Sequence, residues 1–568
     1  MGRDSRGEQR IPAPDVFPDP PVTSRPEALA VVGAGPAGMA AAVTAADHGI
    51  PVTVLDAAAR PGGQFYRAPA PGLGATRPEA LHHGWDVFTA LAARFDRHVR
   101  SGRISHLARH QVWAVERAGD PSVERDSGRD GGADGERARG CWRLHAVTGT
   151  EEDIGTVVDA QNLLIATGSH ERQLPLPGWT TPGVVGAAGA QAMLKSGLVL
   201  PGRRIVVAGS GPLLQAVAIS LARSGAEVPL LVEAAGYEFY ARAPTTLAAN
   251  PAKLVEGARN AAQLLRYGVR LRTHSAVTAV HGRHRVEGVT VSRLDRDWRP
   301  VPGTGRRHDC DAVALGHGLE PRTGLATSLG CATRERADGT HGVVVDAQLR
   351  TTVPGVWAAG ETGGIGGVHL ALVEGELAAL SVVRLTRAET ARHSDGGLPR
   401  RAVALRRART RMRAFAEVMG AAHRPRPGWR QWLSGDTEVC RCEEVTADRI
   451  LTSVSELGAG DARTVKLLTR AGMGWCQGQT CGFAVRELIG PAASGAGPGR
   501  QALACPVLLS VLAGHPPAPG AAGDSDAAET AGGAGATGEP GGTSGSGEPG
   551  GTGEPGGTSG SGGTSGSG

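Results

Sequence analysis

The sequence predicts an α/β protein in which one strand–turn–helix unit is inserted into another and a small cysteine-bearing domain follows. Three observations support this prediction. A glycine-rich turn begins at Gly33, directly after an apolar run, and a second begins at Gly209 in the same setting. Four cysteines then gather between Cys440 and Cys481. Because apolar runs alternate with segments of helical pattern, we expect parallel sheets covered by helices.

The first turn has the setting that dinucleotide binding requires. Residues 28–32 form an apolar run typical of a strand, and an Ala-rich segment after the turn predicts a helix. Gly33 permits the sharp turn, Gly35 lets the backbone approach a pyrophosphate, and Gly38 lets helix and strand pack closely. Amides at the helix N-terminus would attract the phosphates. The next predicted strand ends at Asp56, which is placed to accept hydrogen bonds from a ribose.

Three later segments favour FAD at this turn. Gly63 and Gln64 follow the second strand, where the backbone can fold over the ribityl-phosphate part of a flavin. A strand over 162–168 ends in Thr167 and Gly168, and one over 355–361 ends in Gly360 and Glu361, whose acid would reach a ribitol hydroxyl. We expect FAD to be bound by Gly33, Gly35, Gly38, Asp56, Gly63, Gln64, Thr167, Gly168, Gly360 and Glu361.

The spacing of these segments resembles that of flavoproteins with two dinucleotide-binding domains. In that superfamily the last acid is usually Asp and the ribose acid usually Glu, whereas this chain has Glu361 and Asp56. Both exchanges keep the charge and change the reach by one methylene. They leave the expected roles in place and alter only the contact distances.

The second glycine-rich turn predicts a Rossmann-like domain inserted into the first. Gly209 and Gly211 follow a strand, and the next strand ends at Glu233, which suits a ribose 2′-hydroxyl and repels a 2′-phosphate. The expected ligand is therefore NAD(H) rather than NADP(H). Leu214 replaces the third glycine, which we expect to disturb the pyrophosphate site. Either NAD(H) binds here, or the domain keeps its fold without a ligand.

The four clustered cysteines predict a metal centre. Cys440-x-Cys442 and Cys476-x4-Cys481 can supply two thiolates to each iron of a [2Fe-2S] core. A tetrahedral zinc site and an empty or oxidised site are the alternatives, although structural zinc prefers Cys-x2-Cys spacing. The remaining cysteines are expected to be small buried hydrophobes; they are Cys141, Cys310, Cys331 and Cys505.

Composition divides the chain into expected segments. They are a disordered arm (1–28), an FAD-binding domain in two parts (29–180 and 301–390), a second dinucleotide-binding domain (181–300), a helical linker (391–436), a [2Fe-2S] domain (437–512) and a disordered Gly-, Ser-, Thr-, Pro- and Glu-rich tail (513–568). Within the linker, the basic run Arg400–Arg413 reads as one solvated helix. A polar stretch over 117–140 reads as a hairpin insertion.

Charge and hydropathy exclude several classes of function. The net charge of +5 comes from 60 basic and 55 acidic residues, too balanced for a nucleic-acid-binding surface. The sequence shows neither a stretch of 18 apolar residues, which would predict a membrane span, nor an apolar leader, which would predict secretion. We therefore expect a cytoplasmic protein. No cysteine pair follows the first glycine-rich turn, which argues against a dithiol–disulfide reductase.

The cysteine motifs carry a more specific resemblance. The stretches beginning Cys440-Arg-Cys-Glu-Glu and Gly472-Met-Gly-Trp-Cys are similar to the [2Fe-2S] domain of the BFD type. From about 29 to 512 the chain resembles the large, pyridine-nucleotide-disulfide-oxidoreductase-like subunits of hydrogen cyanide synthase (B type), opine oxidase (A type) and dye-linked proline or hydroxyproline dehydrogenases (alpha type). The supporting stretches are 62–67, 177–183, 208–214 and 316–321. Leu214 belongs to that subgroup's pattern as well.

The resemblance implies that the steps of one reaction are divided among several subunits. A D-amino-acid-oxidase-like subunit would oxidise an amine or amino acid, this chain would relay the electrons through FAD and [2Fe-2S], and a small ferredoxin-like subunit would complete the complex. The chain then offers no general base: His317 and His369 read as structural, while Gln64, Tyr66 and Arg67 would line the isoalloxazine. Two alternatives stay open, a self-contained NAD(P)H dehydrogenase and a non-catalytic nucleotide-binding scaffold.

Overall fold

A computed structural model describes residues 26–118, 141–149, 154–389, 398–490, 501 and 503–514. Most of the expected arm, most of the 117–140 insertion and nearly all of the expected tail lie outside the described residues. None of the helices in the described ranges combines the length and apolar character that a bilayer crossing demands.

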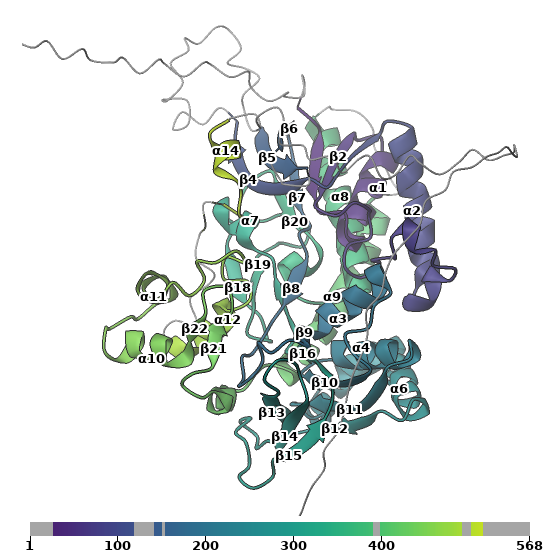
Figure 1. The fold of residues 1–568 in the computed structure, drawn as a ribbon. Helices are drawn as coiled ribbons and strands as arrows, with labels where there is room; N and C mark the ends of the chain where they lie inside the picture. Colours follow the sequence, from purple (N-terminus) through teal and green to yellow (C-terminus); the bar gives the residue numbers. More distant parts are fainter. Residues whose placement is uncertain are drawn as a thin grey trace, which may run out of the picture. The chain divides into compact units, whose positions relative to one another are not determined.

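The first sheet is parallel throughout and has the strand order β20-β7-β1-β2-β3 (Figure 1). Its strands are β1 (Leu29–Val32), β2 (Val52–Asp56), β3 (Ile104–Ala108), β7 (Leu163–Ile165) and β20 (Val356–Ala358). The helices α1 (Pro36–Asp47), α2 (Trp85–Arg100) and α8 (Val368–Glu389) belong to this domain. α1 packs on α8, because its Ala-rich sequence allows two helices to approach closely. β20 comes from a segment almost 200 residues after β7, so the domain is built from two parts of the chain.

Between β3 and β7 lies an antiparallel meander. Its strands are β4 (Gln111–Arg117), β5 (Trp142–Thr148) and β6 (Ile154–Ala160). The segment at 503–514, which includes the short helix α14 (Leu509–Leu512), returns to this meander. The Ala504 amide donates to the Trp113 carbonyl at 2.8 Å, and buried Cys505 lies against Val112. The expected end of the [2Fe-2S] domain at 512 was therefore too late.

The second sheet is also parallel, with the order β12-β11-β10-β16-β9. Its strands are β9 (Val184–Gly186), β10 (Arg204–Gly209), β11 (Glu227–Glu233), β12 (Arg270–Arg272) and β16 (Ala312–Gly316). Helices α3 (Ala187–Gly197), α4 (Leu213–Arg223), α5 (Pro244–Ala248) and α6 (Pro251–Arg266) accompany it, with a meander of β13 (Ser275–His281), β14 (Gly288–Arg293) and β15 (Arg306–Asp309). Since β16 pairs with β9 and β10, this domain continues past residue 300, where we expected it to end. An apolar strand ending in glycine suits either sheet, so its sequence could not assign it.

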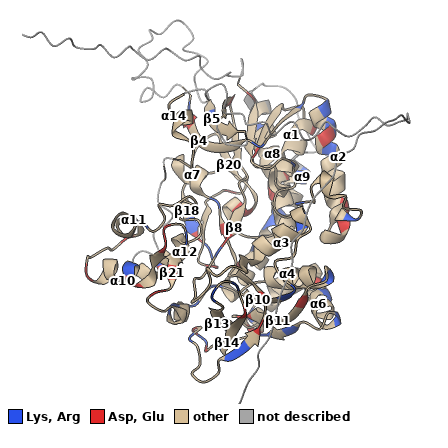
Figure 2. Cartoon of the chain, in the orientation of Figure 1, with Lys and Arg blue, Asp and Glu red and all other residues tan. Residues whose placement is uncertain are grey.

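Two short antiparallel ribbons lie outside these sheets. β8 (Ser169–Glu171) pairs with β17 (Leu319–Pro321), and β18 (Thr333–Glu335) pairs with β19 (His341–Val343), with α7 (Gly324–Ser328) between them in the chain. Basic and acidic side chains both appear on outer helices such as α2 (Figure 2), as the balanced composition suggested. The linker forms α9 (Leu398–Ala422), which packs on α8, and the 3₁₀ turn η6 (Pro427–Trp432).

The cysteine-bearing domain is small and mostly helical. It contains β21 (Glu438–Cys440), β22 (Val445–Thr446), α10 (Ala447–Ser455), α11 (Ala462–Thr469) and α12 (Gly482–Ile489). Its hydrophobic core is continuous with that of the second dinucleotide domain: Trp298, Trp432 and Phe483 belong to one buried cluster. The Trp432 indole also donates to the Trp298 carbonyl at 3.0 Å. The two-domain insertion and the C-terminal cysteine domain predicted from the sequence are confirmed.

Candidate functional site

The first glycine-rich turn has the close contacts that a dinucleotide cradle needs. Gly33 ends β1 with a φ of 102°, and a Cβ at Gly38 would lie 1.8 Å from the Gly33 carbonyl oxygen. Gly35 is the N-cap of α1, and a Cβ at Gly63 would lie 2.8 Å from the Gly35 Cα. Two glycine-bearing loops therefore face each other above the N-terminus of α1, where its free amides favour a phosphate. Side chains at these positions would fill the cradle.

Asp56 stands at the end of β2 with one oxygen unsatisfied. Its Oδ1 accepts a hydrogen bond from the Ala58 amide at 3.3 Å, whereas the buried Oδ2 has no partner among the described residues. Burial raises the pKa of this carboxyl to about 6. A buried acceptor without a donor is costly, and the hydroxyl of a bound ribose would supply the donor. Asp56 therefore fits its expected role in binding FAD.

The segments expected at the flavin meet at the end of β7. The Gly168 amide donates to the Thr362 hydroxyl at 3.3 Å, and the Thr167 hydroxyl donates to the Arg322 carbonyl at 2.8 Å. The Ser169 hydroxyl donates to Glu361 Oε2 at 2.5 Å. Burial raises the pKa of Glu361. The structure therefore brings the turn at Gly168 and the turn at Gly360 together, although 190 residues of chain separate them.

The residues expected at the isoalloxazine differ in how exposed their side chains are. Gln64 is exposed, but Tyr66 is only 2% exposed and its ring stacks on Phe88 at 4.6 Å between centroids. Buried Lys195 donates to the Phe65 carbonyl at 2.8 Å, and burial lowers the pKa of Lys195 to about 8. Tyr66 thus contributes mainly to the packing under this loop.

A buried carboxylate that sequence reasoning missed supports the Gly360 turn. Glu374 of α8 is 1% exposed and accepts from the Gly360 amide at 3.0 Å. Arg409 and Arg413 of α9 also donate to it, with Nε–Oε1 distances of 2.8 and 2.9 Å. Arg413 further donates to the Gly364 carbonyl at 2.6 Å. The expectation that the Arg400–Arg413 run is one solvated helix was wrong for these two arginines. Both are largely withdrawn from solvent and pair with Glu374, which is distant in the sequence.

The second glycine-rich turn is closed by the chain's own side chains. The Gly211 amide, which would meet a pyrophosphate, donates instead to Glu233 Oε2 at 3.0 Å. Glu233 Oε1 accepts from the Ala235 amide at 3.0 Å and lies 3.4 Å from Nδ1 of His423. His423 follows α9, and its Nε2 is 3.0 Å from the Tyr240 hydroxyl. Glu233 and His423 are both buried. The expected NAD(H) residues are together, but their polar groups already have partners.

Leu214 occupies the position of the missing third glycine without strain. It is 1% exposed and packs in the core of the second domain. The carboxylate of Glu171 accepts from the Ala188 amide at the start of α3, at 2.8 Å. Burial raises the pKa of Glu171 to about 7. Two carboxylates, those of Glu171 and Glu233, therefore lie close to the strand ends where an anionic pyrophosphate would have to bind.

The four clustered cysteines come together in two pairs. The Cys440 thiol interacts with that of Cys481, which lowers the pKa of Cys440 to about 5 and raises that of Cys481. Cys442 and Cys476 interact in the same way. As the chain stands, no three His, Cys, Asp or Glu side chains of the described ranges are arranged to hold a metal ion. The donor set of two thiol pairs fits a two-iron core with two thiolates for each iron.

Backbone groups near the thiols fit the same cluster. The Gly472 amide donates to Cys440 Sγ at 3.5 Å. A Cβ at Gly474 would lie 2.3 Å from the Cys442 Cβ, so only glycine fits beside that thiol. Amide donors to sulfur stabilise a negatively charged cluster. The site would be held by Cys440, Cys442, Cys476 and Cys481, and the bound cluster would carry electrons singly whereas FAD exchanges them in pairs.

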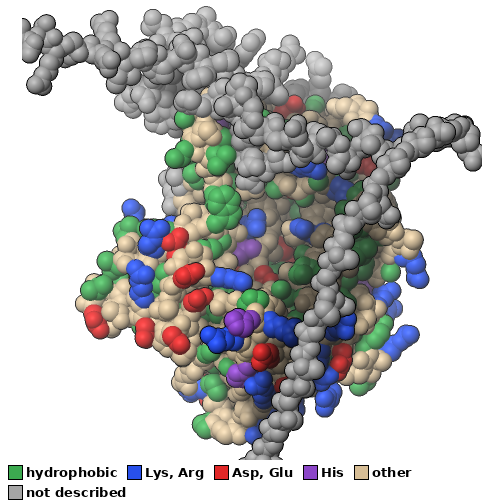
Figure 3. Space-filling model, viewed as in Figure 1, with side chains coloured by type: hydrophobic (Ala, Val, Ile, Leu, Met, Phe, Trp, Pro, Cys, Tyr) green, Lys and Arg blue, Asp and Glu red, His purple; other side chains and the backbone are tan. Residues whose placement is uncertain are grey.

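The cysteine loop reaches the molecular surface. Cys442 is exposed, and Trp475, next to Cys476, is 73% exposed. Leu467 of α11 is 66% exposed as well. Figure 3 shows hydrophobic, basic and acidic side chains together on the lobe formed by α10 and α11. An aromatic side chain exposed to this degree beside a redox centre is accessible to another molecule.

The β8–β17 ribbon links the two cofactor regions. Ser169 of β8 contacts Glu361, while Glu320 of β17 accepts from Arg486 Nη2 of α12 at 2.6 Å. Arg172, directly after β8, is 2% exposed and lies 4.8 Å over the Phe483 ring of α12. One short ribbon therefore joins the expected flavin turn to the cysteine domain.

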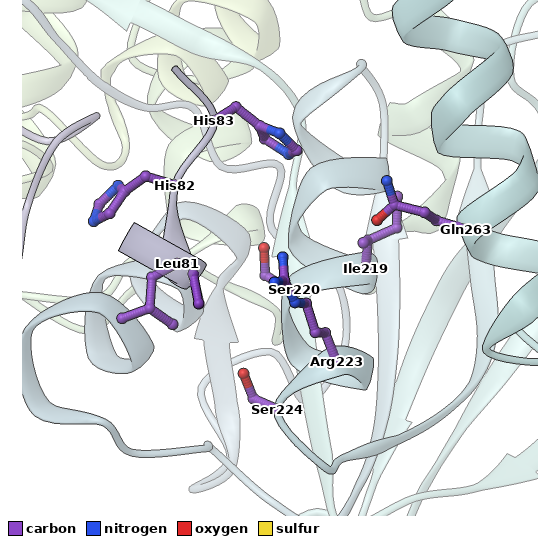
Figure 4. Close-up of a pocket in the computed structure, with 9 residues that line it drawn as sticks. Leu81, His82, His83, Ile219, Ser220, Arg223, Ser224 and Gln263 are labelled. Carbon is purple, nitrogen blue, oxygen red and sulfur yellow. The ribbon is translucent and has the colours of Figure 1, made fainter. Parts of the chain in front are cut away.

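A small cavity lies apart from these sites. It has a volume of about 150 Å³ and separates the turn at 78–84 from α4 and α6. Figure 4 shows its lining, which includes Leu81 and His82 of that turn and Ser220 and Arg223 of α4. It contains none of the expected cofactor residues. His317 is also excluded as a general base, because it is 2% exposed and burial lowers its pKa to about 3.

Comparisons with known proteins agree with this geometry. The chain matches the pyridine nucleotide-disulphide oxidoreductase family over residues 27–375 and the BFD-like [2Fe-2S] binding domain over residues 438–490. Hydrogen cyanide synthase subunit HcnB of Pseudomonas aeruginosa is 33% identical over 464 residues, which are 79% of this chain and 90% of that protein. The A-type subunit of opine oxidase from Agrobacterium tumefaciens is 31% identical over 475 residues, 81% of this chain and 85% of that one.

Among solved structures, L-proline dehydrogenase from P. horikoshii shares the fold, with a TM-score of 0.59 and 18% identity over 88% of this chain and 81% of that one. The matched domains carry FAD and a [2Fe-2S] cluster as cofactors, and the matched relatives are oxidoreductases. The chain belongs to the pyridine nucleotide-disulphide oxidoreductase family and carries a C-terminal BFD-like [2Fe-2S] binding domain.

Proposed function

We propose that this chain is the electron-relay subunit of a complex that oxidises an amine or amino acid of the opine, proline, hydroxyproline or glycine type. A D-amino-acid-oxidase-like subunit removes the electrons from the substrate, and they pass through FAD and the [2Fe-2S] cluster of this chain to an acceptor. A small ferredoxin-like subunit completes the complex. The relatives named as subunits of hydrogen cyanide synthase and opine oxidase support this proposal.

One observation carries the proposal: the β8–β17 ribbon contacts both cofactor regions. Ser169 bonds to Glu361 at the expected flavin turn, and Glu320 pairs with Arg486 of the cysteine domain. FAD would be bound by the ten residues expected from the sequence and the cluster by the four clustered cysteines. We further propose that the protein works in the cytoplasm, where thiols that could bind an iron–sulfur cluster stay reduced.

The self-contained NAD(P)H dehydrogenase is less well supported. Its hydride would have to enter at the turn of Gly209 and Gly211, where Glu233 and His423 occupy the polar groups. The scaffold alternative leaves the paired thiols and the exposed Trp475 without a purpose.

The experiment is reconstitution. The purified chain, loaded with FAD and iron, is mixed with a panel of amino acids and a dye acceptor, with and without a co-expressed D-amino-acid-oxidase-like subunit. We expect dye reduction only when both chains are present, and reduction of this chain's flavin and cluster in the same mixture. Substrate oxidation by this chain alone, or flavin bleaching by NADH at a comparable rate, would contradict the proposal.

A further inference from the structure

His170 is the residue of β8 that faces the cysteine domain. It lies between Ser169, which bonds to Glu361, and Glu171, which caps α3. Because side chains alternate along a strand, Ser169 and His170 point to opposite sides of the ribbon. The same short strand therefore presents one residue to the flavin turn and the next residue to the cluster loop.

The imidazole of His170 is buried without a hydrogen bond. Both ring nitrogens are inaccessible, and neither has a partner of acceptable geometry among the described residues. Its Nε2 is 3.8 Å from Glu320 Oε2, too far for a hydrogen bond. Burial lowers its pKa; Glu320 and a contact with the Gln479 backbone oppose this shift, whereas Arg322 and Arg486 add to it. A neutral imidazole always carries one N–H group, and a buried donor left unpaired is costly.

The Gln479 backbone shows which loop of the cysteine domain the ring approaches. It belongs to the five-residue step from Cys476 to Cys481, within the loop that would enclose the cluster. Sulfur atoms of a bound cluster accept hydrogen bonds, and such bonds help to set its reduction potential. The cluster is the group that this part of the chain is built to hold, and it would place acceptors where the histidine has none.

We propose that His170 donates its missing hydrogen bond to the [2Fe-2S] cluster and thereby sets how readily the cluster accepts an electron from the flavin side. This inference rests on the proposed function only for the direction of electron flow. His170 is a positioning residue: it does not bind substrate or iron. A donor stabilises the reduced cluster, which carries one more negative charge, so its loss makes the cluster harder to reduce.

The test uses the full chain alone, loaded with FAD and iron, and needs no partner protein. The variants are His170→Phe, which removes the donor, His170→Gln, which keeps one, and His308→Phe as a matched control. His308 also has a buried, unpaired ring nitrogen, but it lies on β15 of the second domain. Iron content and unfolding are measured first, followed by a potentiometric titration of the cluster monitored by electron paramagnetic resonance.

We expect His170→Phe to lower the equilibrium constant for cluster reduction about tenfold, which is 59 mV for one electron. His170→Gln should recover part of the shift, and His308→Phe should show none. In wild-type protein labelled with ¹⁵N-histidine, the reduced cluster should show a weak ¹⁵N coupling that His170→Phe abolishes. Equal potentials in His170→Phe and His308→Phe would overturn the inference. Loss of iron from both His170 variants in otherwise folded protein would also overturn it, because His170 would then be needed for cluster assembly. These potentials are measured without a partner protein, so the expected shifts would be the same even if the relay proposal failed.

Discussion

Arg413 of α9 and Glu374 of α8 form a buried ion pair at 2.8 Å that holds the loop expected to bind the flavin. The same guanidinium donates to the carbonyls of Gly360 and Gly364. Removing one partner of a buried pair typically costs roughly 3–5 kcal/mol, because the other charge stays buried. Because Arg409 still pairs with Glu374, we expect Arg413→Ala to destabilise the chain by less than this amount and to release FAD on gel filtration.

The matched control for Arg413 is Arg411→Ala, two positions earlier on the same helix. Arg411 is exposed and has no ion pair among the described residues. We expect urea unfolding of this variant to change by less than about 0.5 kcal/mol. Equal FAD retention in the two variants would show that the pair does not support the flavin loop.

Asp56 predicts a pH dependence in the FAD-free chain. Its pKa rises from 3.8 to about 6 on folding, so the folded state prefers the protonated carboxyl. The stability it contributes is present below pH 4 and is lost as the pH rises through about 6. By linkage the loss is on the order of 3 kcal/mol. We expect Asp56→Asn to melt at a higher temperature than the wild type at pH 7 without FAD, and to bind FAD more weakly.

The measurement for Asp56 is a series of thermal melts from pH 4 to pH 7, with and without FAD. The difference between variant and wild type should grow with pH without FAD and shrink when FAD is added, because the ribose then supplies the missing donor. A difference that does not vary with pH would remove the carboxyl as its cause.

The four clustered cysteines predict a metal count. Cys442→Ser replaces an exposed thiol of the cluster site, whereas Cys505→Ser replaces a buried thiol packed on Val112. We expect iron and inorganic sulfide to fall from about two per chain to near zero in Cys442→Ser and to stay unchanged in Cys505→Ser. Stoichiometric zinc in the wild-type protein, in place of iron, would refute the cluster assignment.

Restoring the third glycine of the second turn should not create an NADH site. Leu214 is buried in the core, so Leu214→Gly should cost about 3–5 kcal/mol through the cavity it leaves. The Gly211 amide would still be bonded to Glu233. We expect millimolar NADH to leave the flavin oxidised in both proteins, as followed by absorbance. Rapid bleaching in the variant alone would show that Leu214, not Glu233, excludes the nucleotide.

The sequence was most informative where a feature is local. Gly33, Gly38 and Asp56 could be placed from their spacing, because turn, helix start and strand end follow each other within a few residues. The same holds for Cys440 and Cys442. The glycine-rich turns and the cysteine motifs, taken together with the hydrophobic periodicity, were enough to predict both parallel sheets and the order of the domains.

What remained hidden depends on pairs that are distant in the chain. Nothing near Glu374 indicates that it will be buried under Arg413, and nothing near His423 indicates that it will meet Glu233. The expected domain bound at residue 300 left Ala312–Gly316 with the FAD-binding domain, whereas this strand pairs with the second sheet, because strand pairing depends on contacts distant in the chain.

The shared hydrophobic core of Trp298, Trp432 and Phe483 determines how an electron acceptor reaches the cluster. Iron–sulfur modules on flexible tethers can swing between donor and acceptor, but this one is anchored by buried tryptophans. The cluster therefore stays in one place, and any electron acceptor must dock beside it. Deleting residues 438–490 would remove Phe483 and the rest of the cysteine domain from this core and expose its apolar surface, so the flavoprotein part should aggregate when expressed alone.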